Sequence, residues 1–400
     1  MKKIHRGRRQ GAGEPLSAGR VEYLEQARQR VRGKRLRRTA VIVTALTLVL
    51  LFATGFVGSS VAVAKDWADT ARILLFPGLG WPQQTGSFVE LGADGCVVYS
   101  RTGTRLNSIQ SGYARPALAA GKSRFVLYNR SGNELRVESR TQNLYTKTME
   151  NSIYLCAMAD NGTLAVVTED PGSTAKLLVY SSSMEQQLSW NMTITDGTPL
   201  RMAFSPDGRR LAVAAVTVNA GQMVTNFYVV TLAQGDPVLV GSQSGAAQWL
   251  SWPSGASLLA VCDNRAMLYN VSGGEKAAYD FAGQTLRDVS VDASGNIGLL
   301  LVSGQLCQAV MLDRSLNVQN TSSVQAANRI VRAGSQFYLL TDNGVECLAQ
   351  DGTSQWTQTL AARPQGLLAD KKQLLVFCGN TVQVLTPPEA ADTSGASANT

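Results

Sequence analysis

The sequence predicts an all-β protein: a β-propeller of seven blades, with eight as the alternative, preceded by a single transmembrane α-helix. Three observations predict this architecture. Residues 39–64 form an uncharged apolar run, a unit of about forty residues recurs after residue 86, and helical periodicity is absent from those units. In chain order we expect a basic cytoplasmic tail (1–38), the transmembrane helix (39–60), a juxtamembrane stalk (61–86), the propeller (87–386) and a disordered polar tail (387–400).

The basic tail carries the excess positive charge of the chain. The 400 residues include 37 Lys or Arg and 29 Asp or Glu, a net charge of +8. Residues 1–38 alone hold 13 basic and 3 acidic residues, so the remainder of the chain is slightly acidic. A nucleic-acid interface needs basic residues on the folded domain, and the sequence therefore predicts no nucleic-acid partner.

The apolar run is long enough for a membrane helix, since about 20 helical residues cross roughly 30 Å of hydrocarbon. Five Lys or Arg residues lie between positions 32 and 38, just before the run. By the positive-inside rule the N-terminus is cytoplasmic and the propeller extracytoplasmic, at the cell membrane. A cleaved signal peptide is the alternative, because residues 62–64 (AVA) have the small-x-small form of a cleavage site. The length of the apolar run favours the retained anchor. Residues 65–76 are expected to form a short amphipathic continuation.

The repeated unit is an apolar strand, a tight turn and a second apolar strand. The turns are centred on Gly121, Gly162, Gly208, Gly255, Gly295, Gly334 and Asp370, with spacings of 36 to 47 residues. Each unit has room for four strands, which is the content of a propeller blade. Residues 87–386 accommodate about seven such units. Residues 87–106 and 365–386 are expected to pair and complete one blade, which would remove the open edge of the ring.

Two motifs carry a family resemblance. Residues 204–214 (FSPDGRRLAVA) resemble the SPDG hairpin of TolB-like and WD-type propellers, and residues 351–356 (DGTSQW) resemble the end strand of quinoprotein-like repeats. The layout of tail, span and propeller is similar to bacterial single-pass membrane proteins of unknown function. The resemblance implies the fold; no cofactor is expected, because the Trp-docking repeats of quinoproteins are mostly missing.

Arginine recurs at the head of the first strand of the units. The set consists of Arg115, Arg201, Arg287, Arg329 and Arg363, with Gln248 at the corresponding position of the fourth unit. Guanidinium groups around one mouth of a ring can bind a phosphate or carboxylate bidentately. The set is therefore a candidate anion-binding ring. The alternative is that each arginine pairs with an acidic group such as Asp288 and fixes the register between blades.

The His, Cys and Trp residues of the sequence argue against catalysis. The single histidine, His5, lies in the basic tail, which removes His-based triads and His-ligated metals from the folded part. The six cysteines are expected to be buried thiols rather than disulfides: Cys96, Cys156, Cys262, Cys307, Cys347 and Cys378. Trp249, Trp252 and Trp356 are expected to pack between blades. We assign no catalytic, metal-binding or cofactor-binding residue.

These features predict a non-enzymatic binding or scaffold protein of the bacterial cell envelope, whose partner is a protein or an anionic envelope polymer. One alternative is a hydrolase or lyase that acts on an envelope polymer through carboxylates, as propeller glycosidases do. The first strands offer few acids and no repeated pair, which disfavours it. Another alternative is a sensor whose output passes through the cytoplasmic tail.

Overall fold

The computed structural model describes residues 72–76, 87–92, 95–100, 104–292, 294–333, 335–370, 373–378 and 381–385. The expected tail, the helix at 39–60 and residues after 385 lie outside this part. Among the described residues, no helix has the length and apolarity needed to cross a membrane.

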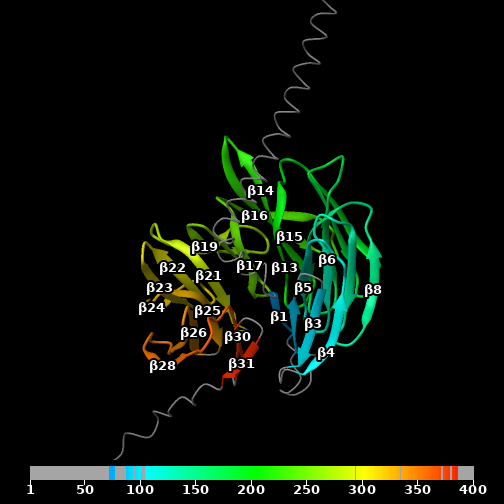
Figure 1. Ribbon diagram of the computed structural model, residues 1–400. Coiled ribbons are helices and arrows are strands. Elements are labelled where there is room, and N and C mark those ends of the chain that lie inside the picture. Colours follow the sequence, from blue (N-terminus) through cyan, green and yellow to red (C-terminus); the bar gives the residue numbers. More distant parts are fainter. Residues whose placement is uncertain are drawn as a thin grey trace, which may run out of the picture. The chain divides into compact units, whose positions relative to one another are not determined.

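The described strands form eight antiparallel sheets, which we number as blades 1 to 8 (Figure 1). Blade 1 contains β1 (Arg72–Phe76), β2 (Ser87–Leu91), β3 (Gly95–Ser100) and β4 (Arg105–Gln110). Blade 2 contains β5 (Pro116–Ala120), β6 (Phe125–Asn129), β7 (Glu134–Glu138) and β8 (Asn143–Thr148). Blade 3 contains β9 (Ile153–Met158), β10 (Leu164–Thr168), β11 (Ala175–Tyr180) and β12 (Gln186–Met192). Blade 4 contains β13 (Thr198–Phe204), β14 (Arg210–Asn219), β15 (Gln222–Thr231) and β16 (Pro237–Ser244).

The second half of the ring continues the pattern. Blade 5 contains β17 (Ala247–Ser254), β18 (Ser257–Cys262), β19 (Arg265–Asn270) and β20 (Glu275–Asp280). Blade 6 contains β21 (Thr285–Val291), β22 (Ile297–Ser303), β23 (Leu306–Leu312) and β24 (Val318–Val324). Blade 7 contains β25 (Ala327–Ala333), β26 (Gln336–Thr341), β27 (Gly344–Leu348) and β28 (Ser354–Thr359). Blade 8 contains β29 (Gly366–Asp370), β30 (Gln373–Cys378) and β31 (Thr381–Leu385).

The first strands are innermost, since β5, β9, β13, β17, β21, β25 and β29 each contact the first strand of the preceding blade. Second strands are buried on both faces, and they read as continuous apolar runs such as LAVVT (Leu164–Thr168). The hydrophobic core is therefore divided among the interfaces between blades. Val126 and Leu135 of blade 2, for example, share one cluster with Leu164 and Val166 of blade 3.

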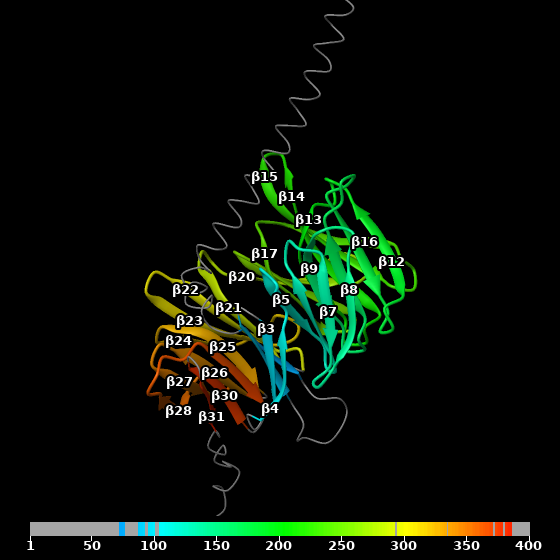
Figure 2. The ribbon, with the colours of Figure 1, turned by 45° about the vertical axis from the view of Figure 1, so that its right-hand side comes forward.

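The structure corrects the blade count and the closure. The count of seven is wrong and the alternative of eight is confirmed. Strands β2 to β4 belong to a blade whose first strand is β1, and the C-terminal strands form their own blade, so the two ends do not share a sheet. The sequence repeat missed β1 because residues 77–86 separate it from β2, and β1 falls inside the range expected as a stalk. Blades 1 and 8 lie side by side (Figures 1 and 2).

Packing, rather than strand pairing, joins blades 8 and 1 within the described residues. Phe88 of β2 and Leu375 and Phe377 of β30 are buried together, and we call this contact the seam. The rings of Phe88 and Phe377 meet edge to face with centroids 5.5 Å apart. Aromatic pairs favour this arrangement, so the seam is a small apolar core of its own.

Blade 4 departs from the other blades in the length of its central hairpin. Strands β14 and β15 have ten residues each and pair from Arg210 to Thr231. Ala220 and Gly221 form the turn with φ values of 49° and 81°, a two-residue connection that suits the twist of a hairpin. Figure 1 shows this hairpin projecting beyond the neighbouring strands.

Candidate functional site

The six residues of the predicted ring all lie where the chain enters a blade. Arg201 is on β13, Gln248 on β17, Arg287 on β21 and Arg329 on β25, while Arg115 comes one residue before β5 and Arg363 three before β29. We call these six positions, at one end of the innermost strands, the entry mouth. The structure thus places the predicted residues at corresponding ends of their blades.

A β-bulge recurs at the entry mouth in five consecutive blades, from blade 3 to blade 7. In blade 4 the register passes from Pro199 opposite Ala215 to Arg201 opposite Ala214, which leaves Leu200 unpaired. The unpaired residues in the five blades are Tyr154, Leu200, Gln248, Arg287 and Asn328. A bulge bends the strand and redirects the side chains beside it.

The bulges divide the predicted ring into two sets of positions. Gln248 and Arg287 are the unpaired residues themselves, whereas Arg201 and Arg329 follow the bulge. The residues equivalent to Arg201 are therefore Trp249 in blade 5 and Asp288 in blade 6. An ungapped comparison of the units placed Gln248 at the position of Arg201, because nothing in the sequence marks an extra residue in a strand.

Two of the arginines connect neighbouring blades through backbone carbonyls. Arg201 Nε donates to the Gln248 carbonyl of the next blade at 3.1 Å. Arg287 Nη1 donates to the Ala327 carbonyl of the next blade at 2.9 Å. Burial lowers the pKa of Arg201, and the positive charge of Arg130 lowers it further. Arg201 nevertheless keeps its positive charge, because a guanidinium is not deprotonated in proteins.

Acidic residues contact two more members of the entry mouth. Arg329 Nη1 lies 3.2 Å from Asp288 Oδ1, and the other oxygen of Asp288 accepts the Ile330 N–H at 2.9 Å. Burial raises the pKa of Asp288 despite the opposing charge of Arg329. Arg363 Nη2 lies 3.0 Å from Asp342 Oδ1 in an exposed pair. These contacts are of the kind that would fix the register between neighbouring blades. Anion binding at the entry mouth stays a prediction.

The two remaining members of the entry mouth, Gln248 and Arg115, differ in the contacts of their side chains. Gln248 donates from its side-chain amide to Asp263 of the same blade. Arg115 is exposed, and its side chain makes no hydrogen bond or ion pair within the described part of the chain. Arg115 is thus a guanidinium at the entry mouth that a ligand can reach.

The prediction for Trp249, a side chain at the entry mouth, is wrong. Trp249 was expected to pack between blades, but 38% of its surface is exposed. Trp252, three residues further on, does pack between blades and donates its indole N–H to the Ala203 carbonyl at 2.9 Å. Because side chains alternate along a strand, residues 249 and 252 lie on opposite faces of β17.

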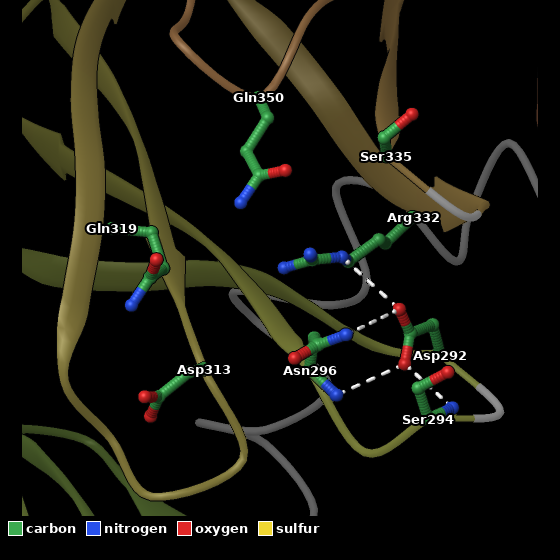
Figure 3. Close-up of a pocket in the computed structure, with 8 residues that line it drawn as sticks. All are labelled: Asp292, Ser294, Asn296, Asp313, Gln319, Arg332, Ser335 and Gln350. Atoms are coloured by element: carbon green, nitrogen blue, oxygen red, sulfur yellow. Dashed lines mark hydrogen bonds and ion pairs between the residues drawn. The ribbon is translucent and has the colours of Figure 1, made fainter.

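A second site lies between blades 6 and 7, where their strands turn at the other end of β21 and β25. It is a cavity of about 280 Å³ (Figure 3). Arg332 lies at its base, with Nε 3.1 Å from Asp292 Oδ2, and these side chains are only 5% and 7% exposed. Arg332 Nη1 also donates to the Leu312 carbonyl at 3.3 Å, and its guanidinium covers the Phe337 ring at 4.6 Å. Burial lowers the pKa of Arg332, and Asp292 opposes that shift.

Two matching turns form the walls of this cavity. Each contains the pattern D-x-S-x-N, beginning at Asp292 and at Asp313. Asp292 Oδ1 accepts the N–H groups of Ser294 and Asn296 at 2.8 and 2.9 Å. Asp313 Oδ1 accepts the two corresponding N–H groups at 2.7 and 2.9 Å. Burial alone would raise the pKa of Asp313, but these hydrogen bonds and the Asn317 side chain hold it below the usual 3.8.

The residues that line the cavity are polar, and Arg332 balances part of their negative charge. The amides of Gln319 and Gln350 face it from opposite blades (Figure 3). Asp292 and Arg332 already pair, so the cavity offers hydrogen bonds to a small polar molecule rather than a strong charge. Sequence reasoning missed Arg332, although the alternation of Asp288 and Ser290 on β21, continued by Asp292 directly after the strand, was a readable signal. Period two puts those three side chains on one face, and all three contact blade 7.

The cysteines behave as the sequence predicts: all six are free and buried. Burial raises the pKa of Cys96 and of Cys262 to about 12, so both thiols stay protonated and inert at neutral pH. Among the described residues, no three or more His, Cys, Asp or Glu side chains gather as a metal site would require.

Comparisons with known structures identify the fold. Sqt1 from Chaetomium thermophilum, solved bound to the N-terminus of the ribosomal protein L10, is 13% identical and superposes with a TM-score of 0.55 over 80% of this chain and 97% of that one. BamB from Moraxella catarrhalis is 11% identical, with a TM-score of 0.52 over 78% and 95%. Apo AztD from Citrobacter koseri is 10% identical, with a TM-score of 0.52 over 74% and 96%. At such identities the likeness concerns the fold alone.

Sequence comparison identifies the family. No curated protein matches the chain. Residues 83–312 match a family described as "Family of unknown function (DUF5711)", and this match spans more than half of the 400 residues. The chain therefore belongs to the DUF5711 family, and in this member the fold is an eight-bladed β-propeller.

Proposed function

We propose that the protein is a membrane-anchored propeller on the outer side of the bacterial cell membrane, where it binds another envelope component as a scaffold and catalyses no reaction. Propellers serve many functions, so the fold alone does not decide among them. A relative in fold, Sqt1, was solved with a protein segment bound, which supports a binding role by analogy.

The exposure of Trp249 carries this proposal. A Trp with 38% of its surface exposed lies on an innermost strand, and arginines occupy the same end of the neighbouring first strands. Trp and Arg are the residue types most enriched at the energetic centres of protein interfaces. Arg287 is exposed at the same end of the first strand of the next blade. The entry mouth is thus the surface we assign to the partner, a protein or an anionic polymer.

Membrane anchoring would favour such binding. The uncharged run at 39–64, preceded by a cluster of Lys and Arg, supports a retained span with the propeller outside. Holding the ring at one surface raises its effective concentration toward partners at that surface. Modest affinity at the entry mouth would then suffice.

Crosslinking in intact cells tests the binding role. Trp249→Ala should reduce the yield of crosslinked adducts at least about tenfold, since removing an interface centre costs about 2 kcal/mol or more. Leu306→Ala is the matched control, because Leu306 is 77% exposed but lies on β23, away from the innermost strands. Equal adduct yields from wild type and Trp249→Ala would refute the entry mouth as the binding surface.

Cell fractionation tests the anchor separately. The full chain should stay in membranes after alkaline extraction, with an intact N-terminus, and protease added outside the cell should degrade the propeller. A soluble product that begins at Lys65 would instead establish the cleaved signal peptide.

A further inference from the structure

Within the part of the chain that the structure describes, blade 8 has three strands, whereas each of the other blades has four. Strand β31 occupies the third position and pairs with β30, from Leu374 opposite Leu385 to Cys378 opposite Thr381. In each of the other seven blades the third strand pairs on both sides. Within the described residues, the outer edge of β31 therefore has no neighbouring strand.

Val384 is exposed at a position that is buried in the other blades. Val384 lies opposite Leu375 of the second strand, and this position has an equivalent in blades 2 to 7. The six equivalents are Val137 (1% exposed), Val179 (0%), Val229 (2%), Leu268 (5%), Met311 (0%) and Cys347 (0%). Val384 is 47% exposed, so a side chain that the fold otherwise buries is open to solvent here.

The other blades also show which kind of fourth-strand residue lies beside the position of Val384. The fourth-strand residues directly opposite the six equivalents are Tyr145, Leu188, Val238, Ala277, Asn320 and Trp356. All but Asn320 are apolar or aromatic. Directly opposed side chains across a ladder are the unit of sheet stabilisation. A strand that completes blade 8 should therefore place a large apolar side chain opposite Val384.

The edge itself is suited to pairing. Strand β31 has the sequence TVQVL, which is rich in β-branched residues and lacks the charges and prolines that block edge strands. Residues 386–400, TPPEAADTSGASANT, have two prolines directly after Thr386 and contain no Val, Ile, Leu, Met or aromatic residue. That stretch does not hold the apolar side chain that the position demands.

We propose that blade 8 is completed by an extended strand of a partner protein, which pairs antiparallel with β31 and buries a large apolar residue against Val384. Backbone hydrogen bonds to the edge would give the affinity, and the apolar residue would give the specificity. The inference deepens the proposed binding role but uses a different surface from the entry mouth.

A synthetic peptide tests this directly. The probe is the eight-residue peptide TSQWTQTL, copied from residues 353–360, which holds the fourth strand of blade 7 and its Trp356. Fluorescence anisotropy with the full chain in detergent should show saturable binding. Val384→Asp should weaken it at least about tenfold, because an interfacial charge would be desolvated. Replacing the peptide's Trp with Ser should weaken it similarly.

Matched controls make the result decisive. Val318→Asp changes a side chain of similar exposure, 51% against 47%, on the outer strand β24 of a complete blade, and it should not affect binding. Trp249→Ala should also leave peptide binding unchanged, which separates this inference from the entry mouth. If Val384→Asp fails to fold, Val384→Thr keeps the side-chain shape and should weaken binding less.

Hydrogen exchange of the β31 amides completes the test. These amides should exchange fast in the protein alone and slow down when the peptide is added. Amides already protected without the peptide, together with no binding, would assign the fourth position to the chain's own residues and overturn the proposal. Equal binding to wild type and Val384→Asp would overturn it as well.

Discussion

The interface between blades 6 and 7 and the seam between blades 8 and 1 close the same ring by different means. At the first, Asp288 and Ser290 of β21 and Asp292 directly after it contact the backbone and side chains of β25, over an apolar core that includes Phe337. At the seam, Phe88, Leu375 and Phe377 pack together, with Tyr99 and Leu368 beside them.

The difference teaches what each kind of contact can specify. Hydrogen bonds and buried ion pairs are directional, so they fix one blade against the next in a single register. Apolar contact is non-directional and depends on area, so it joins surfaces without fixing their register. We therefore expect the seam to open before the interface of blades 6 and 7 when the ring unfolds locally.

The largest effect is expected from breaking the buried pair. Arg332→Leu leaves the Asp292 carboxylate buried without its counter-ion, which should destabilise the protein by about 3–5 kcal/mol. The double variant Asp292→Leu/Arg332→Leu removes both charges and should recover part of that loss. Urea denaturation measures both; a double variant less stable than the single one would contradict this account.

Truncating the seam should have the next largest effect. Phe377→Ala removes a ring that is 5% exposed and should cost about 3 kcal/mol. Amides of β2 and β30 should then exchange faster than those of β22 and β26. Phe337→Ala at the interface of blades 6 and 7 is the control: it should destabilise the ring without speeding exchange at the seam. Uniform acceleration in both variants would remove the distinction between the two interfaces.

The pH dependence should be opposite for two carboxylates of blade 6. The pKa of Asp313 is lowered on folding, so its contribution to stability is present above the usual 3.8 and is lost as the pH falls through the folded value. The pKa of Asp288 is raised, so its contribution is present at low pH and is lost as the pH rises through the folded value. The stability cost of Asp313→Asn should therefore shrink on acidification, whereas that of Asp288→Asn should grow. Thermal unfolding between pH 3 and pH 7 distinguishes them, and parallel curves would be the contrary result.

The smallest effect is expected from a surface ion pair. Lys122 Nζ lies 2.7 Å from Asp160 Oδ2, between turns of blades 2 and 3, and the side chains are 49% and 36% exposed. Lys122→Ala should cost no more than about 1 kcal/mol, since solvent and salt screen such a pair. The midpoint of urea unfolding, determined at low and at high salt, measures this loss of stability. A loss comparable to that of Arg332→Leu would show that burial is not what separates the two interfaces.

The sequence anticipated the blades because their turns need particular residues. Gly162, Gly208 and Gly295 all have positive φ, at 88°, 67° and 84°, so glycine recurs at those turns and marks the repeat. The matching turn at Asp313 carries Leu316 with φ of 65°, and no glycine marks it. Leu316 is buried in the core of blades 5 and 6, and its packing offsets the unfavourable backbone.

The sites were less predictable than the fold. The entry mouth was located by its arginines, but the bulges that separate Gln248 from Arg201 add a residue without disturbing the apolar pattern. Trp249 was assigned to packing together with Trp252, although the alternation of side chains along a strand places residues 249 and 252 on opposite faces. The unpaired edge of β31 was not predicted, because it appears only in the strand pairing of the described part of blade 8.

The long hairpin of blade 4 has one more consequence. Eight blades of similar structure would present nearly the same surface to a partner after each rotation by one eighth of a turn. Because β14 and β15 reach past their neighbours at Ala220 and Gly221, that side of the ring has a landmark in blade 4. A partner that contacts this hairpin would therefore meet the ring in one rotational setting.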